Sequence, residues 1–180
     1  LVFSLELTND NPPIGTEQQG LSQSELLDLR DITGLVEADF TLNREASFDN
    51  FAGLYVVDDE QGRVNGIAPG EAGYAQAALS QRIEDLNLFV DNQETANFDN
   101  QTLQGEVLLA PYIIADSNVT EFLEQNPENL LEQGPLAYFA YLEANPDGVD
   151  HIRLLGDNTF GFEDQLNGGD FDYNDMTIQV

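Results

Sequence analysis

The sequence predicts an all-β fold: an antiparallel β-sandwich, jelly-roll-like, with one or two short helices. Short apolar stretches, several of them alternating with polar residues, recur along the chain between turns rich in Gly, Asn and Asp. Only residues 71–83 carry a clear helical pattern. A chain of 180 residues is long enough to bury one proper core, so we expect a single domain over 1–180.

Strands are expected in the first third of the chain at 1–7, 26–32, 35–42 and 46–57, with a polar loop over 9–20. Residues 35–42 alternate clearly, which places Ala38, Phe40 and Leu42 on one inner face. Residues 46–57 are more continuously apolar, as is typical of a central strand that is buried on both faces.

A helix is predicted over 71–83. Pro69 and Glu71 suit its first turn and Arg82 its last turn, because the helix dipole favours acids at the start and bases at the end. Its apolar stripe, which we interpret as core packing, consists of Ala72, Ala75, Ala78, Leu79 and Ile83. The acidic triplet before it, 58–60, is interpreted as a solvent-exposed turn.

The second half predicts a short strand at 86–90, a polar loop over 92–104, and one or two strands over 107–115 with Pro111 at an edge or bend. A helical turn at 118–124 has Ser117 or Asn118 as its cap, and 136–142 is a buried strand. The turn at 145–148 precedes a hairpin of 151–155 and 159–163, which leads into a final strand at 176–180.

The composition is strongly acidic. The chain has 34 Asp and Glu against 5 Lys and Arg, a formal net charge of −29, and no Cys. This charge argues against nucleic acid and anionic membrane surfaces as partners, and it favours multivalent cations. Disulfides and thiol chemistry are excluded, and a single His leaves almost no basis for histidine catalysis or a histidine-rich zinc site. No apolar run is long enough to insert into a membrane.

The densest acidic pattern lies at 162–180, where Glu163 and Asp164 precede a Gly-Gly turn and a second group of acids. Asp170, Asp172 and Asn174 occupy the first three ligand positions of an EF-hand-type loop. Asp175 stands where that loop needs Gly, and no ligating Glu follows, so this is not an EF-hand. The Gly-Gly pair occurs once, which excludes a calcium-binding nonapeptide array.

Acids packed this tightly repel one another unless a positive charge lies among them, and few Lys or Arg are near. Calcium prefers such oxygen ligands. We therefore predict one calcium site formed by Asp170, Asp172 and Asp175 with Glu163 or Asp164. The alternative interpretation is a solvated acidic hairpin without an ion.

The C-terminal part resembles the family called domain of unknown function 4114. The resemblance lies in the run 137–180, and its most specific part is Phe160-Gly161-Phe162-Glu163-Asp164 and Gly168-Gly169-Asp170-Phe171-Asp172-Tyr173-Asn174-Asp175. Residues 35–55 and 69–82 also resemble members of the family, so the resemblance spans most of the chain. The resemblance implies a calcium-binding, β-rich module of cyanobacterial or other bacterial secreted proteins, including adhesins. It also implies Glu163, Asp164, Asp170, Asp172 and Asp175 as ligands. Members often carry an Asp/Asn/Gly-rich insertion where this chain has only 60–68, so a second calcium site is not expected there.

Three functions follow as hypotheses. The first is a non-catalytic calcium-binding module, excised from a larger extracellular or cell-surface protein such as an adhesin or matrix component, with glycans or cell-surface components as partners. The second is a calcium-dependent carbohydrate-binding module, for which the tyrosines would have to be exposed and coplanar. The third is a hydrolase with paired carboxylates, which is disfavoured because Glu163 and Asp164 are adjacent and point to opposite faces of a strand. His151 is expected to be a strand-surface or hydrogen-bonded residue rather than a proton shuttle.

Overall fold

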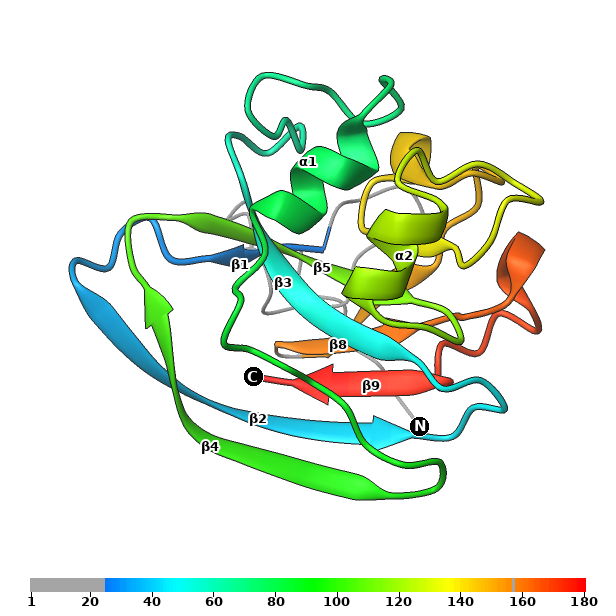
Figure 1. Cartoon of the computed structure of the whole chain (residues 1–180). Coiled ribbons are helices and arrows are strands. Elements are labelled where there is room, and N and C mark those ends of the chain that lie inside the picture. Colours follow the sequence, from blue (N-terminus) through cyan, green and yellow to red (C-terminus); the bar gives the residue numbers. More distant parts are fainter. Residues whose placement is uncertain (1–24, 157) are drawn as a thin grey trace, which may run out of the picture.

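A computed structural model describes residues 25–156 and 158–180 (Figure 1). Two antiparallel sheets form a sandwich, and two short helices lie over the outer face of one sheet. The predicted all-β sandwich with short helices is therefore confirmed. The strand predicted at 1–7 and the loop at 9–20 lie outside the described residues.

The first sheet is built around β5 (Leu108–Ile114), which pairs with β3 (Phe51–Val57) on one side and with β1 (Leu27–Asp28) and β6 (Ala137–Phe139) on the other. The second sheet has the order β4-β2-β9-β8-β7. Its strands are β2 (Leu35–Arg44), β4 (Thr95–Gln104), β7 (Ile152–Gly156), β8 (Thr159–Phe162) and β9 (Met176–Gln179). Every strand pair is antiparallel.

Two apolar clusters lie on opposite faces of the first sheet. Between the sheets, Phe40 and Leu42 of β2 and Phe160 of β8 belong to the same cluster as Leu54 and Ile113 of the first sheet. The second cluster joins the other face of that sheet to the helices. As a result β5 is buried along its whole length, whereas the second sheet turns a polar face to solvent.

The helices are α1 (Tyr74–Ser80) and α2 (Val119–Gln125), and two single turns, η1 (Leu142–Ala144) and η2 (Leu166–Gly168), are of the 3-10 type. Helix α2 follows its predicted cap, because the side chain of Asn118 accepts a hydrogen bond from the Glu121 amide. The prediction for α1 was too long. Gly70 and Gly73 both adopt left-handed backbone angles, and the carboxylate of Glu71 accepts from the Ala68 amide instead of lying in a helical turn.

The polar loop predicted over 92–104 is wrong, since most of it forms the ten-residue edge strand β4. Its inner face carries Ala96, Phe98 and Leu103, but a register shift opposite Ala38 and Phe40 breaks the alternation. Polar side chains cover the outer face and the free edge, which is how edge strands avoid pairing with other chains. The strand predicted at 86–90 makes only an isolated bridge from Leu88 to Ala52.

Pro111 also departs from the prediction, because it lies inside the central strand β5 rather than at an edge or bend. It is opposite Leu54 of β3. On its other side, β1 pairs only up to Leu109 and β6 begins pairing at Tyr112. Pro lacks an amide hydrogen. Pro111 lies between the part of β5 that pairs with β1 and the part that pairs with β6, where its nitrogen is not required to donate a hydrogen bond.

Candidate metal centre

The acidic turn connects β8 to β9 and is wound from unusual backbone conformations. Five of its residues have positive φ angles, which lets a short segment fold back on itself. These residues are Asn167, Gly168, Gly169, Phe171 and Tyr173. The turn begins with Glu163 directly after β8 and rejoins the sheet at Met176 of β9.

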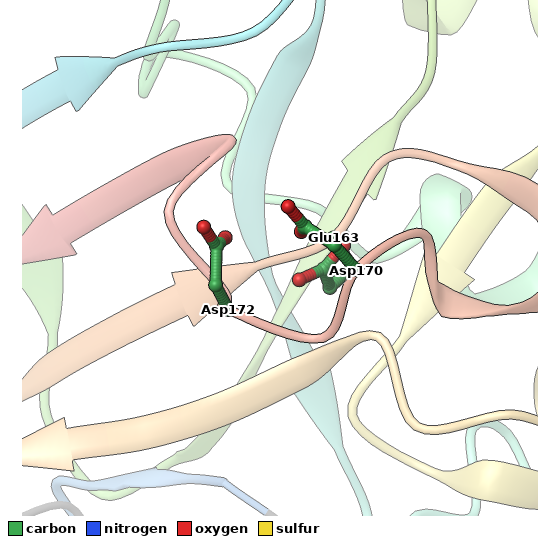
Figure 2. A group of neighbouring side chains, drawn as sticks. All are labelled: Glu163, Asp170 and Asp172. Atoms are coloured by element: carbon green, nitrogen blue, oxygen red, sulfur yellow. The ribbon is translucent and has the colours of Figure 1, made fainter.

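Three carboxylates converge in this turn. One oxygen from each of Glu163, Asp170 and Asp172 lies within 4.8 Å of the others. Figure 2 shows that Glu163 comes from the segment after β8, while the two aspartates come from the loop that leads to β9. At this separation each pair of ionised carboxylates repels by about 3 kcal/mol at an effective dielectric constant of about 20. The group therefore favours a bound cation.

Glu163 is the buried member of the group, with its side chain fully shielded from solvent. Its Oε1 accepts a hydrogen bond of 2.7 Å from the Tyr173 amide, whereas its Oε2 has no hydrogen-bond partner among the described residues. Burial, followed by the charges of Asp175, Asp170 and Asp172, raises the pKa of Glu163 to about 7. A buried carboxylate oxygen without a donor is costly in the ionised state, which a cation would relieve.

Gly169 leaves the space in front of this oxygen open. A Cβ atom at position 169 would lie 2.8 Å from the Oε2 of Glu163, closer than real contacts allow. The residue also has a φ of +49°, which side chains rarely adopt. Glycine at this position therefore leaves space beside the buried carboxylate that a side chain would fill.

Asp172 is oriented by Asn174. The Asp172 Oδ1 accepts from the Asn174 amide at 3.1 Å, and its Oδ2 accepts from the Asn174 side-chain amide at 2.6 Å. Each carboxylate oxygen retains a second lone pair, so these bonds are compatible with metal coordination. In the structure Asn174 thus positions a candidate ligand.

Asp164 and Asp175 form a second, adjacent pair. The Asp175 Oδ2 accepts from the Asp164 amide at 2.9 Å, and the Asp164 Oδ2 accepts from the buried side chain of Asn50 at 2.6 Å. Burial and the proximity of Asp175 raise the pKa of Asp164 to about 6. The charge of Asp175 also raises the pKa of Glu163, so Asp175 interacts electrostatically with both groups. The side chain of Asp164, by contrast, is held toward β3.

His151 and Asp147 form hydrogen bonds with the backbone of the acidic turn. His151 is fully buried, and its Nδ1 lies 2.9 Å from the Glu163 carbonyl oxygen. Its Nε2 lies 2.9 Å from the Oδ2 of Asp147, which also accepts from the Asn167 amide at 2.7 Å. The ring stacks on Tyr138 at 3.6 Å. Of the two predicted alternatives, the hydrogen-bonded histidine is confirmed and the strand-surface one is wrong, because the ring is buried. Nothing in the sequence pointed to Asp147 or Asn50 as partners of the acidic turn.

The aromatic residues do not form a flat exposed platform in the described part of the chain. The six tyrosines are buried, and the exposed rings are Phe48, Phe89 and Phe171. None of the close ring pairs joins two of these three residues. Within the described residues, neither helix is long and apolar enough to cross a bilayer.

Together, the fold and the turn define a β-sandwich domain with a carboxylate cluster between β8 and β9. A family model described as Domain of unknown function (DUF4114) matches residues 92–180, which confirms the resemblance to that family over this segment. The matched segment runs from just before β4 to the end of β9 and includes all six predicted ligands. Searches of curated proteins and of solved structures give no match.

Proposed function

We propose that this chain is a non-catalytic calcium-binding module of an extracellular or cell-surface protein, in which calcium stabilises the turn between β8 and β9. The observation that carries the proposal is the Oε2 of Glu163. It is buried and lacks a hydrogen-bond donor in the described chain, and one carboxylate oxygen of Glu163 lies within 4.8 Å of oxygens of Asp170 and Asp172. A cation at this point supplies the missing partner.

Oxygen separations of up to 4.8 Å are compatible with calcium and with magnesium, and we favour calcium for its coordination chemistry. Calcium binds oxygen at about 2.3–2.6 Å, so two ligands on opposite sides of one ion lie about 4.6–5.2 Å apart. Magnesium ligands lie closer, and magnesium keeps its water more strongly. The mixture of buried and exposed carboxylates in an irregular loop also suits the flexible coordination of calcium, with backbone carbonyls and water as further ligands.

We propose an extracellular location because a partly exposed site in a loop is expected to bind calcium weakly. Asp170 and Asp172 are solvent-exposed, and the binding loop must be ordered around the ion. Extracellular calcium modules have dissociation constants of about 10⁻⁴–10⁻³ M. A site of this kind fills only where calcium reaches millimolar concentrations, and then adds about 1–3 kcal/mol of stability at ten to a hundred times its dissociation constant.

Calcium titration of melting temperature and of heat release tests the proposal. We expect calcium to raise the melting temperature well beyond sodium chloride at matched ionic strength, and magnesium to have a smaller effect. Asp172→Ala should remove most of the calcium-induced rise. Asp59→Ala serves as the control, because Asp59 lies in the distant 58–60 turn, where it accepts hydrogen bonds from Arg63. Equal losses in both variants, or none in Asp172→Ala, would place the site elsewhere.

A further inference from the structure

A cavity of about 620 Å³ opens beside the acidic turn. Its wall is formed by Phe48 before β3, by Asp116 and Glu121 around the start of α2, by Tyr138 of β6, and by Asp164 and Leu166 of the turn. The volume is that of a typical site for a small ligand or a short peptide segment. None of Glu163, Asp170 and Asp172 lines it, and the Asp164 side chain in its wall accepts a hydrogen bond from Asn50.

The charges in this cavity are all negative. Asp116, Glu121 and Asp164 contribute carboxylates, and none of the lining residues is Lys, Arg or His. One fully buried amide links two of these residues, since Asn50 donates to Asp164 at 2.6 Å and accepts from the Asp116 amide at 3.2 Å. The side chain of Asp164 is 2% exposed and held in place, which is unlike a freely solvated surface acid.

Apolar groups line the same cavity and remain partly open to water. Phe48 is 37% exposed and Leu166 is 46% exposed, although both are large hydrophobic side chains. Leu136 and Pro135 add further apolar surface next to Tyr138. Carboxylates beside exposed apolar surface are complementary to a side chain with a cationic head and an apolar methylene stem. The same carboxylates repel anions.

We propose that this cavity binds a basic peptide segment of a protein partner, with an arginine side chain inserted among Asp116, Glu121 and Asp164. The planar guanidinium has five donors in a fork that matches several carboxylates at once, and it stacks on aromatic rings such as Phe48. The methylene stem of the arginine covers Leu166. The site shares only Asp164 with the predicted calcium ligands, and it does not require the calcium function because none of these contacts involves Glu163, Asp170 or Asp172.

Titration with short capped peptides tests this proposal. The probe is an acetylated, amidated Ala-Arg-Ala tripeptide, and the control replaces arginine with citrulline, which has nearly the same shape but no charge. Binding is followed by calorimetry and by amide NMR shifts, with excess calcium and again with chelator. We expect the arginine peptide to bind at least about tenfold more tightly, since hydrogen bonds to charged groups have this magnitude. The largest shifts should fall at residues 115–121 and 164–166.

Charge-matched variants distinguish this cavity from general attraction to an acidic protein. Asp164→Asn and Glu121→Gln should each weaken arginine-peptide binding by about tenfold, whereas Asp99→Asn, on the distant edge strand β4, should leave it unchanged. Glu121 is exposed, so Glu121→Gln retains the fold even if Asp164→Asn does not. Equal affinity for the two peptides, equal loss in Asp99→Asn, or no binding in either buffer would overturn the proposal.

Discussion

Replacing Glu163 with Gln should have opposite effects on stability with and without calcium. In the absence of calcium, raising the pH through the elevated pKa ionises a buried carboxyl. A pKa of about 7 against an ordinary value of 4.5 corresponds to a cost of about 3 kcal/mol once the pH exceeds 7. Because this pKa is raised in the folded state, wild-type stability falls as the pH rises from 4.5 to about 7.

Glu163→Gln removes this cost. Gln keeps an acceptor for the Tyr173 amide, and its new donor faces the carboxylates of Asp170 and Asp172. At pH 8 in chelator the variant should therefore be more stable than the wild type, by at most about 3 kcal/mol. For a domain of this size that amounts to about 6–12 °C in melting temperature. In calcium the order should reverse or the gap should close, because the variant has lost a charged ligand.

Calorimetric melts at pH 5 and pH 8, in chelator and in calcium, provide the measurement. Glu37→Gln is the matched control, because it removes one negative charge from the exposed face of β2 without contacting the turn. Any gain shared by both variants reflects relief of overall repulsion at a net charge of −29. If Glu163→Gln is destabilised in chelator at pH 8 and keeps the full calcium response, then Glu163 is not the buried ligand.

Three further predictions concern other parts of the molecule. Burial and the nearby Asp150 raise the pKa of fully buried Glu25 to about 9, so the stability of the fold should decline as the pH rises from 4.5 to about 9. Glu25→Gln should flatten this decline, which urea titrations at successive pH values would measure. Gly169→Ala should abolish the calcium-induced rise in melting temperature. Gly66 has a φ of +80° and open space around it, so Gly66→Ala should lower the free energy of unfolding by only about 1–2 kcal/mol and keep the calcium-induced rise. Sodium chloride should raise the melting temperature of the calcium-free protein, because the Debye length falls from about 30 Å at 0.01 M salt to about 3 Å at 1 M. A melting temperature that does not change with salt would contradict the importance of repulsion between the acidic groups.

Strands that alternate cleanly were predictable from the sequence. Residues 35–42 fall within β2, and Phe40 and Leu42 are buried as expected. The strand β4 was missed because its alternation is interrupted where Asn100 adopts a positive φ and its amide bonds to Asp39. The local sequence pattern cannot reveal this hydrogen bond, because its acceptor lies 61 residues away.

The acidic turn was recognisable as a carboxylate cluster, but its division into two groups was not. Glu163 and Asp164 are adjacent, and the structure directs one toward Tyr173 and the other toward Asn50. Asn50 lies 114 residues before Asp164, and the packing of the two sheets brings them together. Which acids share an ion is therefore decided by tertiary contacts, and the assignment of calcium itself remains a prediction.

The position of β9 in the second sheet has a consequence for how the chain folds. β9 lies between β2 and β8 in the sheet. It therefore links the β2–β4 pair, whose strands come earlier in the sequence, to the β7–β8 hairpin, whose strands come later. Each of these pairs can form by itself, but the sheet becomes continuous only when Met176 reaches Arg44, more than a hundred residues away. Contacts of such long range slow folding, because the loop entropy is lost before the contacts are gained. An ion that orders the segment just before β9 would act on this closing step and make folding faster.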